Sequence, residues 1–107
     1  MADQQPTIST HVLDVGHGLP AAGVSVALYA VEGSGERLVG GGTTDEDGRI
    51  RRLLVGPLVA GDYRLEFALE GDFFRQLAVR FHVADIGRSY HVPLIMAPYS
   101  LATYRGS

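Results

Sequence analysis

The sequence predicts an all-β fold, a sandwich or a barrel of short antiparallel strands. Fourteen glycines interrupt its 107 residues, at intervals of about eight to twelve positions that are typical of the turns in small β domains. Between the turns, apolar and polar residues alternate, as expected of strands with one packed and one solvated face. No segment repeats its apolar residues with the period of a helix.

Each expected strand is bounded by turn residues. Residues 16–20 form a turn rich in glycine, and residues 44–48 form an acidic turn. Pro98 separates the last two strands, and Pro93 should stand at a strand start or a sheet edge because it has no N–H to donate. The expected strands are residues 8–15, 24–31, 37–43, 49–54, 62–69, 78–84, 90–97 and 101–104.

Alternation is clearest in residues 62–69 and 78–84. There the apolar side chains at every second position should face the core, while Arg64, Glu66 and His82 should face solvent. The inward set comprises Val24, Val26, Leu28, Tyr63, Leu65, Phe67, Leu69, Val79, Phe81 and Val83.

The charged residues exclude several classes of chemistry. All nine basic residues are arginines, and the net charge is -3. The absence of lysine excludes Schiff-base catalysis and a Walker-type phosphate site. An acidic chain is also a poor partner for nucleic acid, whose backbone requires a positive surface. The absence of cysteine excludes disulfides, a thiolate nucleophile and cysteine-ligated zinc.

We expect one domain over residues 1–107, with residues 1–6 flexible. The N-terminal residues lack the basic and apolar regions of a signal peptide. The longest apolar run, residues 53–60, is broken by Gly56 and Pro57 and is too short to cross a bilayer. The sequence therefore predicts a cytoplasmic protein with no membrane partner.

Histidines, arginines and carboxylates remain as candidate functional groups. His11 shares a strand face with Ser9, and His91 begins an apolar strand. Histidines in such positions titrate near neutral pH, although a hydrogen-bonded structural histidine gives the same pattern. His17 and His82 are expected to be solvated. No H-x-H or H-E-x-x-H spacing occurs, so we expect no metal site.

Two further segments are candidates for ligand binding. Arg49, Arg51 and Arg52 follow the acidic turn; they form either a solvated edge paired with that turn or a face on which a guanidinium binds a planar anion. Strand-like residues 101–104 run almost to the carboxyl end. We therefore expect residues 104–107 to be ordered and inserted into a site.

Five motifs, in chain order, resemble those of one enzyme family. Together they span most of the chain, and the terminal one is the most specific. The motifs are Thr10-His11-Val12-Leu13-Asp14, Gly18-Leu19-Pro20-Ala21-Ala22-Gly23, Thr44 to Arg49, Tyr90-His91-Val92-Pro93-Leu94 and Thr103-Tyr104-Arg105-Gly106-Ser107. The chain resembles the 5-hydroxyisourate hydrolases, which are transthyretin-related enzymes of urate degradation.

The resemblance implies a transthyretin-like antiparallel β-sandwich of about seven to eight strands, assembled as a homotetramer with sites between dimers. It implies hydrolytic opening of the six-membered ring of 5-hydroxyisourate, with neither a metal nor an organic cofactor. The implied catalytic residues are His11, Arg49 and His91, and the implied substrate-binding residues are His11, Arg49, Tyr104, Arg105 and Ser107. Either histidine could be the general base.

The chain departs from the family pattern at three places. Ser89 stands where the family usually has a histidine, and Arg75 stands where a proline usually follows an aromatic pair. Only residues 70–76 are available for the family's short helix, so we expect that helix to be reduced or absent. The alternatives to a hydrolase are a carrier of a small aromatic ligand and a structural module; two histidines with an arginine and the terminal tetrapeptide favour the hydrolase.

Overall fold

The computed structural model describes residues 5–106. Ser107 and residues 1–4, which include most of the segment expected to be flexible, lie outside the described residues. Residues 5–106 contain strands and no helix, so the expectations of an all-β fold and of a missing helix are confirmed. The strands are β1 (Ile8–Asp14), β2 (Leu19–Pro20), β3 (Ser25–Glu32), β4 (Gly35–Thr43), β5 (Arg49–Ile50), β6 (Gly61–Ala68), β7 (Gln76–Val83), β8 (Tyr90–His91), β9 (Leu94–Ala97) and β10 (Ser100–Thr103).

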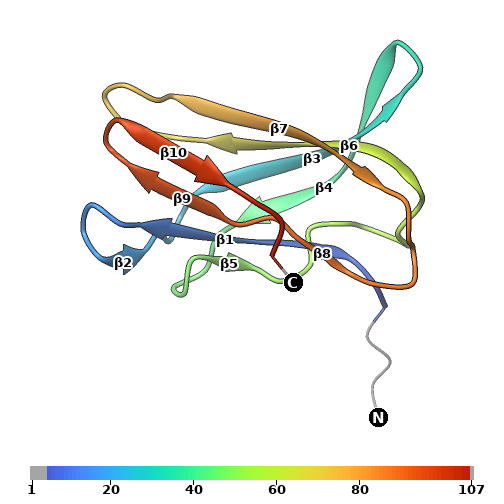
Figure 1. The fold of residues 1–107 in the computed structure, drawn as a ribbon, viewed down its shortest axis with the longest axis horizontal. Coiled ribbons are helices and arrows are strands. Elements are labelled where there is room, and N and C mark those ends of the chain that lie inside the picture. Colours follow the sequence, from blue (N-terminus) through green and yellow to red (C-terminus); the bar gives the residue numbers. More distant parts are fainter. Residues whose placement is uncertain (1–4, 107) are drawn as a thin grey trace.

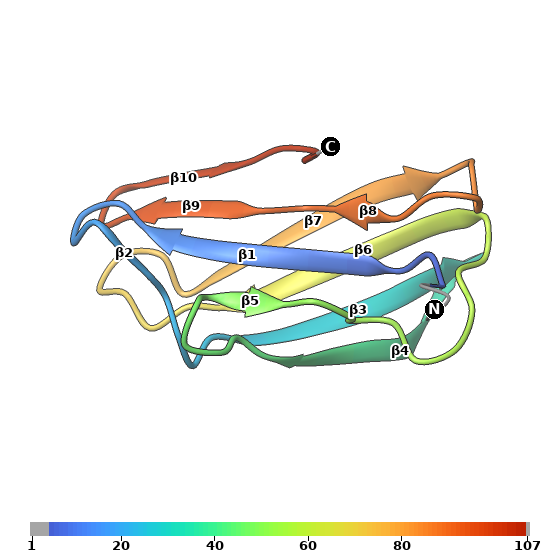
Figure 2. The ribbon, with the colours of Figure 1, turned by 90° about the horizontal axis from the view of Figure 1, so that it is seen from below.

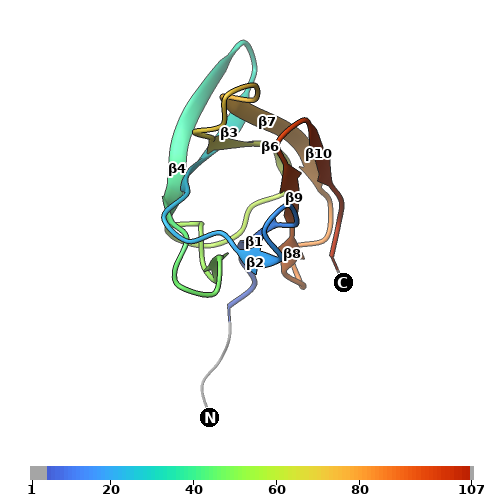
Figure 3. The ribbon, with the colours of Figure 1, turned by 90° about the vertical axis from the view of Figure 1, so that its left-hand side faces the viewer.

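The strands form two sheets packed face to face, which confirms the expected sandwich (Figures 1 and 3). One sheet has the order β4-β3-β6-β7, and all its pairs are antiparallel. The other sheet has the order β10-β9-β1-β2, with β5 and β8 also paired to β1. Figure 2 shows β8 and β9 along one side of β1 and β5 along the other. One feature was not expected from the sequence: β1 runs parallel to β8 and β9.

The core lies between the sheets and follows the predicted alternation. On β6, Tyr63, Leu65 and Phe67 are at most 3% exposed, and burying each apolar side chain of this size contributes about 1.5–3 kcal/mol. The β1 sheet contributes fully buried residues from its own inner face. Val79 and Phe81, also expected inward, are only half-buried because β7 is the edge strand of its sheet.

The strand expected over residues 49–54 is wrong beyond Ile50. Leu53 and Leu54 are both buried, which an alternating strand cannot achieve on a single face. The Leu53 N–H donates to the Ile8 carbonyl at 2.8 Å, and the Leu53 carbonyl accepts from the Gly41 N–H at 2.9 Å. The segment therefore crosses from one sheet to the other, and both of its leucines enter the core.

The β6–β7 connection is short and contains no helix. It is closed by a hydrogen bond from the Leu69 N–H to the Arg75 carbonyl at 2.9 Å. Phe73 of this connection is 63% exposed and contacts the ring of Tyr99, with a centroid distance of 5.8 Å. No helix long and apolar enough to span a membrane occurs in the described part of the chain.

Candidate active site

Strand β1 has one apolar face and one polar face. Ile8, Thr10 and Val12 are at most 1% exposed and point into the core. Ser9 and His11, at the intervening positions, are half-buried. Because successive side chains of a strand alternate between faces, both lie on the outer face of the sheet.

Strand pairing brings two distant residues next to this polar face. His11 lies opposite Arg49 in the antiparallel β1–β5 pair, and Ser9 lies beside His91 in the parallel β1–β8 pair. The neighbouring positions Thr10 and Ile50 are both buried, so His11 and Arg49 point outward together. The structure thus assembles the three predicted catalytic residues, His11, Arg49 and His91, on adjacent strands of one sheet face.

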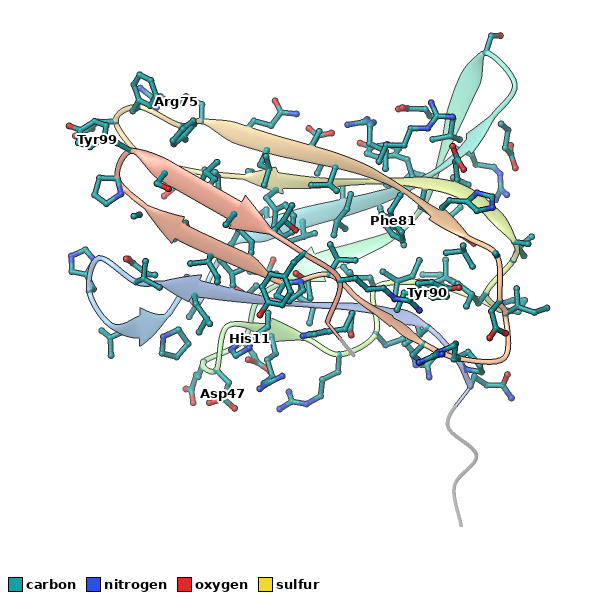
Figure 4. All side chains as sticks on the ribbon, in the orientation of Figure 1. His11, Asp47, Arg75, Phe81, Tyr90 and Tyr99 are labelled. Atoms are coloured by element: carbon teal, nitrogen blue, oxygen red, sulfur yellow. The ribbon has the colours of Figure 1, made fainter. Side chains whose placement is uncertain are left out.

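A backbone carbonyl fixes the orientation of His11. The Nε2 atom lies 2.9 Å from the carbonyl oxygen of Asp47, in the acidic turn below the strand (Figure 4). A carbonyl oxygen can only accept a hydrogen bond, so Nε2 carries the proton. In the neutral imidazole the lone pair of His11 is therefore on Nδ1.

The acidic turn itself is held by Asp45. Its Oδ1 atom accepts hydrogen bonds from the backbone N–H groups of Asp47 at 2.8 Å and Arg49 at 3.0 Å. Its Oδ2 atom accepts from Arg51 at 2.8 Å. The arginines are therefore divided: Arg51 pairs with the turn, whereas the Arg49 guanidinium has no ion-pair partner within residues 5–106.

His91 is held by a side-chain hydrogen bond and by its surroundings. Its Nδ1 atom lies 2.8 Å from the Oγ of Ser9. Burial lowers the pKa of His91 below its ordinary value, and electrostatic interactions with Arg49 and then His11 lower it further. The imidazole is consequently neutral at neutral pH, as a general base must be.

The C-terminal segment is attached to β8 and β9. The Gly106 N–H donates to the His91 carbonyl at 2.7 Å, and the Thr103 hydroxyl donates to the Pro93 carbonyl at 2.7 Å. The Arg105 guanidinium lies over the ring of Tyr90, 4.5 Å from its centroid. Through these contacts the ordered C-terminal segment reaches His91.

Two of the predicted binding residues lie beside the three catalytic candidates rather than among them. Tyr104 and Arg105 border a hollow of about 260 Å³ next to Tyr90 and Val92. A larger hollow of about 580 Å³ opens at one end of the sandwich, near Asp14 and the β6–β7 connection. Neither hollow is lined by His11, Arg49 or His91, all of which are half-buried on the outer face of the sheet.

The two other histidines are exposed, as expected. His17 pairs with Asp14 at 2.9 Å, and His82 pairs with Asp62 at 2.6 Å. Their side chains are 76% and 64% exposed, respectively. Among residues 5–106 no group of three His, Cys, Asp or Glu side chains is arranged to hold a metal ion.

The motifs and the fold agree with a single protein family. Residues 8–106 match the family model described as "HIUase/Transthyretin family". The chain belongs to this family. Within the HIUase/Transthyretin family, a curated relative named 5-hydroxyisourate hydrolase from Deinococcus radiodurans is 41% identical, and the match covers 95% of this chain and 97% of the relative. Another of the same name, from Caulobacter vibrioides, is 37% identical, with coverages of 94% and 97%.

Solved structures from both branches of the family share the fold. The 5-hydroxyisourate hydrolase of Klebsiella pneumoniae superposes with a TM-score of 0.81 at 33% identity, covering 95% of this chain and 99% of that one. Transthyretin from Sparus aurata superposes with a TM-score of 0.83 at 26% identity, covering 96% and 97%. The Deinococcus alignment extends over 115 residues, more than the 107 of this chain, so that relative contains residues without a counterpart here.

Two contacts of the site were not anticipated from the sequence. The shared face of Ser9 and His11 was visible in the alternation, but the contact of Ser9 with His91 depends on a pairing of segments 82 residues apart. In the sequence the acidic turn is a charge partner for the arginines and part of a family motif, and neither interpretation includes a contact with His11. The turn contacts His11 through the backbone carbonyl of Asp47. Every residue has a backbone carbonyl, so the sequence does not indicate such a contact.

Proposed function

We propose that this chain is a 5-hydroxyisourate hydrolase that opens the six-membered ring of its substrate in urate degradation. One observation carries the proposal: His11, Arg49 and His91 lie together on one sheet face, with Gly106 of the C-terminal segment bonded to His91. The family and the curated relatives at 37–41% identity support this activity.

In this proposal His91 is the general base. Its lowered pKa keeps the ring neutral, and its Nδ1 atom is occupied by Ser9. The Nε2 atom, which has no hydrogen-bond partner within residues 5–106, would accept a proton from the attacking water. His11, with its Nε2–H directed to the Asp47 carbonyl, would orient that water through Nδ1.

Arg49 would stabilise the charge that develops on the substrate. Attack on a lactam carbonyl produces a tetrahedral oxyanion, which a fixed positive donor stabilises more strongly than it stabilises the neutral ground state. Arginine suits this role because its planar guanidinium stays protonated and forms two parallel hydrogen bonds. With no ion-pair partner in residues 5–106, Arg49 is available for the substrate.

The reaction is balanced with water as the only co-reactant. The water oxygen bonds to the lactam carbon, and His91 takes one water proton. Collapse of the tetrahedral intermediate breaks the ring C–N bond, and the proton on His91 passes to the leaving nitrogen. Collapse gives a carboxylic acid, which releases its proton to solvent to become a carboxylate, and the ureido group of 2-oxo-4-hydroxy-4-carboxy-5-ureidoimidazoline; no organic cofactor or metal takes part.

We propose that a second subunit closes the site. The three catalytic candidates line neither hollow, and a small planar substrate needs a concave site. A cytoplasmic homotetramer with sites between dimers would supply the opposite wall, and Tyr104, Arg105 and Ser107 would complete the binding surface. Sedimentation that finds an active monomer would contradict this assembly.

The activity can be tested by an ultraviolet assay in which uricase generates 5-hydroxyisourate from urate. We expect the purified chain to accelerate the absorbance decay over the spontaneous rate. Arg49→Ala should lower kcat/KM by about 10²–10³-fold, the effect of losing one oxyanion donor. Arg51→Ala is the matched control and should retain activity, because Arg51 pairs with Asp45. A folded wild-type chain that does not accelerate the decay would favour a carrier of a small aromatic ligand.

A further inference from the structure

We infer that Ser9 is a positioning residue that fixes both the ring orientation and the tautomer of His91. The inference rests on the proposed function, because it gives His91 a defined protonation geometry for the ring-opening reaction. It concerns a residue that lies outside the predicted set of His11, Arg49, His91 and the C-terminal residues.

The contact between Ser9 and His91 is set by the backbone. Their side chains are neighbours in the parallel β1–β8 pair, and the Oγ–Nδ1 distance is 2.8 Å. The same ladder continues on both sides: the Tyr90 N–H donates to the Thr7 carbonyl, and the Val92 N–H donates to the Ser9 carbonyl, each at 2.9 Å. A hydroxyl on a paired strand is held more precisely than one on a loop.

Gly106 confines the other side of the ring. A Cβ atom built at position 106 would lie 2.6 Å from the Cδ2 of His91, so the backbone of Gly106 is already in close contact with that edge. Turning the ring by 180° would exchange Nδ1 with Cδ2 and place a carbon against the Ser9 hydroxyl. The flip would therefore sacrifice the hydrogen bond, and only one ring orientation is favoured.

The protonated state of the ring fixes the direction of this hydrogen bond. While His91 carries the proton taken from water, both ring nitrogens are donors, so the Ser9 oxygen must accept from Nδ1–H in that state. If Nδ1–H already donates to Ser9 in the resting enzyme, the hydroxyl need not reorient during proton transfer. The resting ring then presents the lone pair of Nε2. Arg49 and His11 are the charged or titratable groups that act on the ring. Both disfavour the doubly protonated form, but a charge effect does not select between the two neutral tautomers of His91.

The test compares Ser9→Ala and Ser9→Thr with the wild-type chain. Ser25→Ala is the matched control, because Ser25 is an exposed strand serine on the opposite sheet. Long-range ¹H–¹⁵N NMR spectra report the tautomer of each histidine, and a His91→Gln spectrum assigns the His91 signals. The uricase-coupled assay supplies kcat and KM over a range of pH.

We expect wild-type His91 to be almost entirely in the Nδ1–H form and Ser9→Ala to give a mixture of tautomers. The kcat of Ser9→Ala should fall about tenfold, as expected for one lost hydrogen bond, with little change in KM. Ser9→Thr should restore most of the wild-type kcat and most of the Nδ1–H form, and Ser25→Ala should match the wild type in both.

Two results separate this inference from the proposed function. If the wild type is active and Ser9→Ala keeps both its kcat and a single Nδ1–H tautomer, the positioning role is wrong and the hydrolase assignment stands. If Ser9→Ala mixes the tautomers while the wild type shows no ring opening, the positioning role is supported and the hydrolase assignment is wrong.

Discussion

The Gly106 N–H donates a hydrogen bond to the carbonyl oxygen of His91 at 2.7 Å, and the same glycine lies against the His91 ring. A Cβ atom at position 106 would be only 2.6 Å from Cδ2 and 3.2 Å from Cγ of the ring. The C-terminal segment and the proposed base are thus in direct contact through backbone and ring. A side chain at position 106 could be accommodated only by moving one of them.

We predict that Gly106→Ala lowers kcat by at least tenfold while the fold remains intact. The methyl group would displace either the His91 ring or the C-terminal segment, and a shift of about 1 Å at a catalytic group can reduce the rate by about a hundredfold. The uricase-coupled assay measures the rate, and thermal unfolding checks the fold. Gly35→Ala is the control, because a Cβ atom there meets nothing closer than 4.0 Å. Wild-type kinetics for Gly106→Ala would exclude tight packing of this segment against His91.

The lowered pKa of His91 predicts the pH dependence of activity. Burial, then Arg49 and His11, hold this pKa below its ordinary value of 6.5, and the base acts only when neutral. We therefore expect kcat/KM to be constant near neutral pH and to fall on acidification with an apparent pKa below 6.5. An acid limb centred above 6.5, after subtraction of spontaneous decay, would rule out His91 as the base.

The same shift predicts an effect on stability. Unfolded His91 binds a proton at a higher pH than folded His91 does, so the free energy of unfolding should decrease as the pH falls below 6.5. His91→Gln removes this titrating group and should flatten that part of the pH–stability curve. Urea unfolding at several pH values between neutral and acidic measures both curves, and identical slopes for the two chains would contradict the shift.

We predict that Arg49→Gln raises the pKa of His91 towards its ordinary value. The substitution removes the guanidinium charge that contributes to the shift, although burial remains the larger cause. NMR titration of the His91 ring measures the change without requiring activity. Arg51→Gln should leave the titration unchanged, because Arg51 is paired with Asp45 and Asp47. Equal titration curves for wild type and Arg49→Gln would place Arg49 too far from His91 to act in one site with it.

Much of the fold could be predicted because strands with one buried face carry an apolar residue at every second position. The inward positions of β6, such as Leu65 and Phe67, are fully buried as the alternation indicated. The prediction was wrong beyond Ile50, where consecutive leucines resemble a strand but instead cross between the sheets. Local pattern cannot distinguish these cases, because the hydrogen bonds of Leu53 go to Ile8 and Gly41, both distant in sequence.

The candidate site was predictable by residue type and motif but not by its contacts. His11, Arg49 and His91 were selected from the sequence, and strand pairing brings them together. The separation of Arg49 from Arg51 depends on where β5 ends, which in turn depends on the crossing of Leu53. Parallel pairing of β1 with β8 decides which side chain touches His91. Alternation indicates the face on which each side chain lies, but it does not indicate that these two segments pair.

The run Gly40-Gly41-Gly42 gives a matched pair of predictions for stability. At Gly40, where β4 meets the crossing segment, a Cβ atom would lie 1.8 Å from the carbonyl oxygen of Leu53 and 2.8 Å from its carbon. Both are backbone atoms, so Gly40→Ala should force the sheets apart and destabilise the fold by at least about 1–3 kcal/mol.

At Gly42 a Cβ atom would make ordinary contacts with Ile50 at 3.6 and 3.7 Å, and replacing glycine by alanine within a strand favours the fold by about 0.5–1 kcal/mol. Urea unfolding should therefore show Gly42→Ala at or above wild-type stability and Gly40→Ala well below it. Equal stabilities for the two variants would mean that residues 53 and 54 do not cross against β4 as the structure has them.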